Sequence, residues 1–317
     1  MRTPVNIGDQ LDHYRIDDLL QQTPFASVFR GTDLQTQSAV LIKVPHPEAE
    51  ADPVFADRFK REEEIGKSLR CPGLLSVLTD EARSRPYIVM RWFDGQTLRQ
   101  FLAAEKRLPS ERAINITLGI CDVLEFVENH GITHRDLRPE NVLIGRNDEV
   151  KLINFGMAAK TGARRITFAN LAQSVGFSDY FSPEELAGKR GDVRSDIYAL
   201  GVVLYEMLTG RTPFQGMDPF SRIGKDPTPP RELDPAIPAQ LQEVIYRALE
   251  SEPRKRYANA REFAHDLRHL DQVSVSTRES RDQKRQREAR SKKLLTYTAL
   301  ALVPVVIFAL LLFFARH

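Results

Sequence analysis

The spacing of apolar residues changes near Gly95, and this change constrains the fold more than any other feature of the chain. Before it, short runs such as SAVLIKV at 38–44 are rich in β-branched residues, as strands are. After it, apolar residues recur at helical spacing, as they do over 110–131. We therefore expect an α+β protein, with a small β-rich part at residues 13–93 and a larger helical part at residues 94–270.

A single helix is expected inside the β-rich part. Residues 53–69 have helical spacing, and Asp52 followed by proline provides an N-cap and a first helical residue. Two further strands are expected at 74–78 (LLSVL) and 87–92 (YIVMRW). Residues 1–12 are expected to form an N-terminal tail.

The segment 294–314, LLTYTALALVPVVIFALLLFF, contains 21 residues without a charged side chain. As a helix it would be about 31 Å long, enough to cross a hydrocarbon core of about 30 Å. The alternative is a buried C-terminal core helix, but such a helix rarely lacks a polar face over this length. The pattern therefore predicts one transmembrane helix.

Charged residues flank this segment unequally. The linker 271–293 is polar and basic, whereas only a stub of three residues, 315–317, follows the apolar run. The positive-inside bias predicts a single-pass protein of the cytoplasmic membrane whose body faces the cytoplasm. The lipid bilayer is thus one expected partner.

The net charge of +2 is unevenly distributed along the chain. From Asp271 onward there are nine basic and four acidic residues, a net charge of +5, which leaves −3 for the preceding residues. A body with this charge is not expected to bind nucleic acid. The two cysteines, Cys71 and Cys121, have no metal-binding spacing, and so few cysteines indicate a reducing compartment.

A series of short motifs resembles the bacterial Ser/Thr protein kinases of the eukaryotic (Hanks) type, over roughly residues 12–270. The motifs are, in order, AVLIK, RFKRE, YIVM, HRDLRPEN, NFG, YFSPEE, SDIYALGVVLYEMLTGRTPF and RKRY. Several are weak alone, but their order is hard to produce by chance. The resemblance implies a bilobal kinase-like fold, with a β-rich N-lobe and a larger helical C-lobe.

The resemblance also implies a set of catalytic residues. Lys43 would position the nucleotide phosphates, and Glu62 would pair with that lysine. Two more glutamates follow Glu62 directly, so one of them could pair with Lys43 in its place. Asp136 would accept the proton of the substrate hydroxyl, and Arg138 occupies the usual position of a lysine.

Other residues are expected to bind nucleotide or to support the fold. The expected nucleotide-binding residues are Lys43, Val28, Leu41, Met90 and Leu143. The expected structural residues are His134, Arg135, Glu184, Asp196 and Arg256. Among these, Glu184 and Arg256 match a buried ion pair, and Asp196 matches an aspartate that caps the central helix of the C-lobe.

The sequence departs from the family pattern where nucleotide and metal would bind. Asn154 replaces a metal-binding aspartate, so the expected metal ligands are two neutral amides, Asn141 and Asn154. A unit charge pair at about 4 Å and an effective dielectric near 20 is worth about 4 kcal/mol. Leu41 replaces a small alanine, Phe177 replaces a threonine, and the loop 21–26 lacks the glycines of the family.

These departures predict a membrane-anchored cytoplasmic pseudokinase, a protein-binding, scaffolding or regulatory module that binds no cofactor with high affinity. Its partners would be proteins, including active kinases or membrane complexes. The alternative is an impaired but active Ser/Thr protein kinase that uses ATP with Mg²⁺ or Mn²⁺. A third hypothesis is a switch that binds nucleotide without metal. Phosphotransfer is the measurement that separates an enzyme from a binding module.

Overall fold

The computed structural model describes residues 4–78, 82–160, 179–276 and 302. The chain divides into two compact units, Met1–Val273 and Ser274–His317. The predicted transmembrane segment 294–314 lies outside the described residues, apart from Leu302. Within the described ranges, none of the helices combines the length and the apolar composition that a membrane crossing requires.

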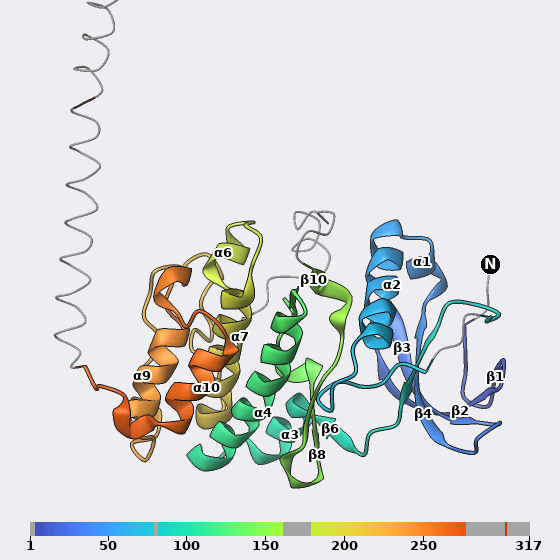
Figure 1. Ribbon diagram of the computed structural model, residues 1–317, viewed down its shortest axis with the longest axis horizontal. Helices are drawn as coiled ribbons and strands as arrows, with labels where there is room; N and C mark the ends of the chain where they lie inside the picture. Colours follow the sequence, from blue (N-terminus) through green and yellow to red (C-terminus); the bar gives the residue numbers. More distant parts are fainter. Residues whose placement is uncertain (1–3, 79–81, 161–178, 277–301, 303–317) are drawn as a thin grey trace, which may run out of the picture. The chain divides into compact units, whose positions relative to one another are not determined.

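The N-terminal part of the first unit is a five-stranded antiparallel sheet in the order β1-β2-β3-β4-β5. Its strands are β1 (Gln10–Leu11), β2 (Tyr14–Gln22), β3 (Ala26–Asp33), β4 (Ala39–Pro45) and β5 (Ile88–Arg91). Two helices, α1 (Pro47–Glu50) and α2 (Pro53–Ser68), lie between β4 and β5 in the chain (Figure 1). The Asp52 carboxylate accepts a 2.8 Å hydrogen bond from the Val54 N–H, so the predicted N-cap of α2 is confirmed.

The strand predicted at 74–78 is wrong. This segment makes only two isolated bridges, a parallel one from Leu74 to Leu152 and an antiparallel one from Val77 to Met90. It therefore connects the two parts of the unit instead of extending one sheet.

The C-terminal part of the unit is mainly helical. Its helices are α3 (Leu98–Glu105), α4 (Ser110–Asn129), α6 (Pro183–Leu186), α7 (Val193–Thr209), α8 (Pro230–Leu233), α9 (Ala239–Ala248) and α10 (Ala260–Arg268). A three-stranded sheet consists of β6 (Gly95–Thr97), β8 (Val142–Gly145) and β9 (Val150–Leu152). β7 (Ile132–Thr133) pairs with β10 (Ala159–Lys160). Short 3₁₀ turns include η1 (Pro139–Asn141) and η3 (Phe155–Met157).

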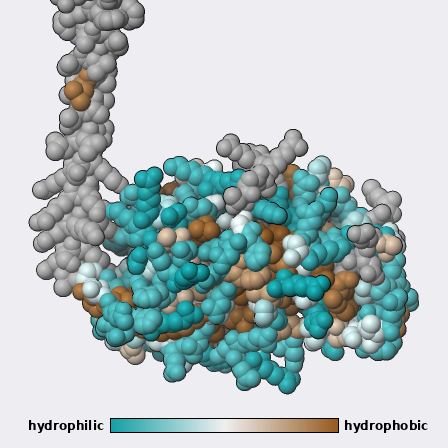
Figure 2. Space-filling view, in the orientation of Figure 1, coloured by the Kyte–Doolittle hydropathy of each residue, from teal (hydrophilic) through white to brown (hydrophobic). Residues whose placement is uncertain are grey.

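Each part has its own hydrophobic core, as a bilobal fold requires. The sheet buries a cluster that includes Tyr14, Phe29 and Ile42. A larger cluster occupies the helical part, where α7 is buried along nearly its whole length until Gly210 ends it with a φ of 75°. Polar residues cover most of the face shown in Figure 2, as expected for a chain in which 28% of residues are charged.

A buried ion pair connects α6 to the segment between α9 and α10. Arg256 donates two 2.7 Å hydrogen bonds, one to each carboxylate oxygen of Glu184, and its side chain is fully buried. Its remaining donors reach backbone carbonyls, including that of Glu250 at 2.6 Å. Burial alone would raise the pKa of Glu184, but the hydrogen bonds from Arg256 outweigh it and hold this pKa below the usual value.

Replacing Arg256 by methionine should lower the free energy of unfolding by about 3–5 kcal/mol, because it leaves the Glu184 carboxylate buried without its partner. The double substitution Arg256→Met, Glu184→Gln should recover a large part of this loss, since it removes both charges. Urea unfolding of the full-length protein, followed by circular dichroism, measures both values. Equal losses in the single and the double variant would contradict the explanation.

Candidate active site

One face of the five-stranded sheet presents four of the predicted site residues. Lys43 and Leu41 are two residues apart on β4, so their side chains point to the same face. Directly opposite in the register, Val28 on β3 pairs with Lys43, and Met90 on β5 pairs with Leu41. The alternate residues of β4, including Ile42, face the core of the sheet. The fifth predicted nucleotide-binding residue, Leu143, is partly buried on β8.

Lys43 forms an ion pair with Glu62 on α2. The ammonium group lies 2.7 Å and 3.0 Å from the two carboxylate oxygens of Glu62. Only 15% of the Lys43 side chain and 10% of the Glu62 side chain are exposed, so water screens this pair far less than a surface pair. The contact fixes the position of α2 relative to β4.

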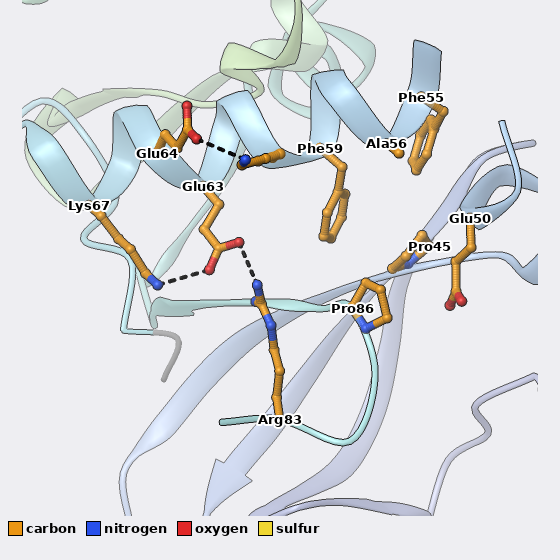
Figure 3. Close-up of a pocket in the computed structure, with 11 residues that line it drawn as sticks. Pro45, Glu50, Phe55, Ala56, Phe59, Glu63, Glu64, Lys67, Arg83 and Pro86 are labelled. Atoms are coloured by element: carbon orange, nitrogen blue, oxygen red, sulfur yellow. Dashed lines mark hydrogen bonds and ion pairs between the residues drawn. The ribbon is translucent and has the colours of Figure 1, made fainter. Parts of the chain in front are cut away.

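The next glutamate on α2 points to different partners. Glu63 lines a cavity of about 510 Å³ and lies 2.7 Å from Arg83 and 3.0 Å from Lys67 (Figure 3). The aromatic ring of Phe59 lies on the same side of the helix (Figure 3). α2 therefore has ion pairs on two sides, and of its three consecutive glutamates it is Glu62 that contacts Lys43.

A third hydrogen bond from Lys43 leads to the C-lobe. Its ammonium group donates to Asn154 Oδ1 at 2.9 Å, and Asn154 Nδ2 donates to Asn141 Oδ1 at 2.5 Å. Asn141 Nδ2 in turn donates to the backbone oxygen of Asp136 at 2.7 Å and to its carboxylate at 2.8 Å. A continuous chain of polar contacts thus runs from Glu62 to Asp136. We call these five residues the polar relay.

The amide of Asn154 suits this place in the polar relay. Its oxygen accepts from an ammonium group while its nitrogen donates to the next amide, so the reversed orientation would set an NH₂ group against Lys43. The backbone of Asn154 has φ 66° and ψ 56°, in the left-handed region. Asparagine adopts this conformation more readily than most residues.

Asp196 on α7 binds the backbone of the catalytic loop, residues 134–141. The Asp196 carboxylate accepts 2.7 Å hydrogen bonds from the backbone N–H groups of His134 and Arg135. The expectation that Asp196 caps its helix is wrong: the side chain that caps α7 is Asp192, which accepts from the Arg194 N–H. Burial raises the pKa of Asp196 to about 7, although these two N–H groups oppose the shift.

His134 is fully buried and remains neutral. Burial lowers the pKa of its imidazole to about 4. Its Nε2 contacts the backbone oxygen of Ile153 at 3.0 Å, and its Nδ1 accepts from the N–H of Asp136 at 3.2 Å. These partners require the tautomer with a proton on Nε2. The imidazole thereby connects the catalytic loop to the strand end that precedes Asn154.

Asp136 has the environment of a general base. Burial raises the pKa of its carboxyl group to about 6, while the positive charges of Arg138 and Lys43 and the hydrogen bond from Asn141 limit the rise. The negative charge of Glu140 raises the pKa of Asp136 further. A base whose pKa lies near neutral pH can accept a proton and release it again at physiological pH.

Four residues in and beside the catalytic loop form a polar cluster that the sequence does not predict. Arg138 donates to Glu140 at 2.7 Å, and Glu140 also accepts from Arg99 on α3 at 2.8 Å. Arg99 contacts Glu206 on α7 and Tyr180 as well. Three of them stand inside motifs of the family, Glu140 in HRDLRPEN, Tyr180 in YFSPEE and Glu206 in SDIYALGVVLYEMLTGRTPF. No motif shows, however, that these separate segments meet at Arg99. A further signal in the sequence is Glu206, the one charged residue in the stretch 197–208 of α7.

The loop between β2 and β3 closes without glycine. Thr23 Oγ1 accepts hydrogen bonds from the N–H groups of Phe25 and Ala26, at 3.3 Å and 3.0 Å, and the Thr23 N–H donates to Ala26 O at 2.9 Å. None of residues 21–26 has a positive φ, so the turn does not need the conformational freedom of glycine. The ring of Phe25 stacks on Phe55 of α2, with centroids 5.8 Å apart.

Two amide oxygens of the polar relay could hold a divalent cation. Each of the two amide oxygens, those of Asn141 and Asn154, accepts one hydrogen bond from the relay and retains a second lone pair. Hard cations such as Mg²⁺ and Mn²⁺ prefer oxygen ligands of this kind. Phe177, the remaining predicted departure, lies outside the described residues.

The fold resembles solved bacterial kinase domains. The crystal structure of the Mycobacterium tuberculosis PknI kinase domain matches with a TM-score of 0.66 and 25% sequence identity, and the match covers 84% of this chain and 100% of that one. A mutant of the same domain matches with a TM-score of 0.65 and 26% identity, covering 85% of this chain and 100% of that one. The bilobal architecture expected from the motifs is therefore confirmed.

Curated relatives are named as Ser/Thr protein kinases. A probable serine/threonine-protein kinase of Streptomyces coelicolor is 34% identical over 276 residues, covering 84% of this chain and 41% of that protein. Serine/threonine-protein kinase PknB of Mycolicibacterium smegmatis is 35% identical over 276 residues, covering 84% and 44%. The chain thus spans less than half the length of these relatives.

These relatives overturn the prediction of a pseudokinase. The similarity to proteins named as Ser/Thr kinases extends over 84% of the chain. Nothing in the comparisons indicates a module without catalysis. The prediction treated each departure as a loss, whereas Asn154 makes ordered contacts with both Lys43 and Asn141.

A family model described as "Protein kinase domain" matches residues 14–268. This range includes both lobes and every residue of the polar relay. The chain belongs to the protein kinase domain family, and its relatives are bacterial Hanks-type Ser/Thr kinases.

Proposed function

We propose that this protein is a Ser/Thr protein kinase that transfers the γ-phosphoryl group of ATP to protein hydroxyls. The observation that carries the proposal is the polar relay, in which hydrogen bonds join Glu62 on α2 to Asp136 in the catalytic loop. A relay of this kind places an ammonium group, two oxygen ligands and a base next to one another before substrate binds. Such preorganisation is the main contribution of a protein to phosphoryl transfer.

Each member of the polar relay has a distinct role in this proposal. Lys43, positioned by Glu62, would bind the phosphates of ATP. Asp136 would accept the proton of the substrate hydroxyl as the new P–O bond forms, and ADP would leave. Asn141 and Asn154 would hold Mg²⁺ or Mn²⁺, which neutralises the charge that develops on the phosphates.

The occupied donors of Lys43 imply a rearrangement when ATP binds. All three hydrogens of its ammonium group are used by Glu62 and Asn154. A phosphate oxygen must therefore share or replace one of these acceptors. The neutral amide of Asn154 is the weaker of the two, so we expect Lys43 to keep Glu62 and release Asn154.

We also propose that the segment 294–314 anchors the protein in the cytoplasmic membrane, with the kinase domain in the cytoplasm. Its 21 uncharged residues and the basic residues before it support this proposal. The partners would then be protein substrates at the membrane and the bilayer itself, and no nucleic acid.

The rate of phosphotransfer should rise with pH through about 6 and stay level above it, because only the ionised form of Asp136 accepts a proton. Asp136→Asn should lower the rate by about 10²–10⁴-fold and abolish the rise of the rate with pH. Transfer of labelled phosphate to a basic protein acceptor at saturating ATP measures the profile. Wild-type activity that persists in Asp136→Asn would contradict the assigned role.

Asn154→Asp should lower the Mg²⁺ concentration for half-maximal rate by at least about tenfold, because it adds a negative charge where the cation would bind. Asn147→Asp is a matched control, since it adds the same charge on an exposed turn of the same lobe. Initial rates over a Mg²⁺ titration give both values. An identical Mg²⁺ requirement in all three proteins would exclude position 154 from the metal site.

The full-length protein should fractionate with membranes. Lysines at Val305 and Phe308 should move it to the soluble fraction, because each charge at the centre of a span costs about 2.5–3.5 kcal/mol. Leucines at the same two positions provide the control and should leave it in the membrane fraction. Ultracentrifugation of cell lysates shows the distribution, and a wild-type protein found in the supernatant would refute the anchor.

A further inference from the structure

The guanidinium group of Arg99 on α3 lies at the centre of a polar cluster next to the catalytic loop. It makes three hydrogen bonds, to Glu140 in η1 at 2.8 Å, to Glu206 on α7 at 2.6 Å, and to the hydroxyl of Tyr180 at 2.5 Å. The Tyr180 hydroxyl in turn donates to the other oxygen of Glu206, at 2.5 Å. We call Arg99, Glu140, Glu206 and Tyr180 the Arg99 cluster.

The contacts within the Arg99 cluster are mutually satisfied. Each of the three nitrogens of Arg99 has an acceptor, and each oxygen of Glu206 has a donor. Glu140 accepts hydrogen bonds from two guanidinium groups, those of Arg99 and Arg138, so two positive charges compensate its carboxylate. The Glu206 side chain is only 9% exposed, and its charge depends on Arg99 for compensation.

The Arg99 cluster ends at the catalytic loop. One oxygen of Glu140 accepts from Arg99 and the other accepts from Arg138 Nε at 2.7 Å. Arg138 follows Asp136 by two residues in the sequence. Among the described residues, none accepts a hydrogen bond from the two terminal nitrogens of Arg138, and 31% of this side chain is exposed. Glu140 thus holds the inner edge of the guanidinium while its outer edge stays available.

We propose that Arg99 is a positioning residue for catalysis, which acts through Glu140 to hold the guanidinium of Arg138 beside Asp136. A free arginine side chain samples many rotamers, and fixing it at Nε removes most of them before substrate binds. A phosphoryl group in transfer gains most from a cation whose position is fixed in advance. This inference rests on the proposed kinase activity.

The test is a double-mutant cycle between Arg99 and Arg138 in the full-length protein. Arg99→Ala should lower kcat for phosphotransfer at least tenfold and change the KM for ATP less than threefold, because the contact acts on the transferred group. Arg138→Ala should lower kcat further. In the Arg138→Ala background, removing Arg99 should change kcat by less than twofold, since its effect passes through Arg138.

A second variant separates positioning from stability. Arg99→Met together with Glu206→Gln removes the guanidinium without leaving a buried carboxylate unpaired. It should unfold at a temperature close to that of the wild type and still show the loss of kcat. Arg112→Ala is the matched control: Arg112 also pairs with a carboxylate, that of Asp148, and is 39% exposed against 37% for Arg99, but it has no contact with the catalytic loop. Its kcat should equal that of the wild type.

The outcomes distinguish this inference from the proposed function. An inactive wild-type protein would refute the kinase activity itself. An active wild type with unchanged kcat in both Arg99 variants would refute the positioning role alone. Equal losses on removing Arg99 in the wild-type and Arg138→Ala backgrounds would show that Arg99 acts independently of Arg138, which also overturns the inference.

Discussion

The carboxylate of Asp196 is the group on which the rest of the active site depends. It is buried and accepts hydrogen bonds from two consecutive backbone N–H groups, those of His134 and Arg135. Arg135 has a φ of 66°, a conformation that most residues avoid. Without this carboxylate two buried N–H groups would lose their partner, and nothing would offset the strain of the turn. The positions of His134, Asp136 and Asn141 all follow from this turn.

From this turn, polar contacts extend in two directions. The polar relay runs through Asn141 and Asn154 to Lys43 and joins the C-lobe to the sheet. The Arg99 cluster runs through Glu140 and joins the same loop to α3 and α7. In both directions each hydrogen-bond donor faces an acceptor. A buried polar network stabilises a unique arrangement under this condition.

Features with a local signal could be predicted from the sequence, and those that depend on distant segments could not. Asp52 was recognisable as an N-cap because the cap, the proline and the apolar period are adjacent. The segment 74–78 resembles a strand in composition, but its two isolated bridges go to strands of two different sheets. The partners of Arg99 are 41, 81 and 107 residues away in the sequence, so no local pattern shows that they meet at this guanidinium group. The functional prediction failed because it counted the charge that Asn154 lacks and not the donor that its amide supplies.

The hydrogen bond between Lys43 and Asn154 also has a kinetic consequence. Lys43 belongs to the sheet and Asn154 to the helical lobe, so the two lobes cannot separate without breaking it. With an aspartate this contact would be an ion pair, whereas with an asparagine it is a hydrogen bond from a charged donor to a neutral acceptor, which is weaker because the acceptor carries no net charge. The two lobes can therefore separate over a lower barrier than an ion pair would impose, so this asparagine favours opening and closing of the domain in the absence of a ligand.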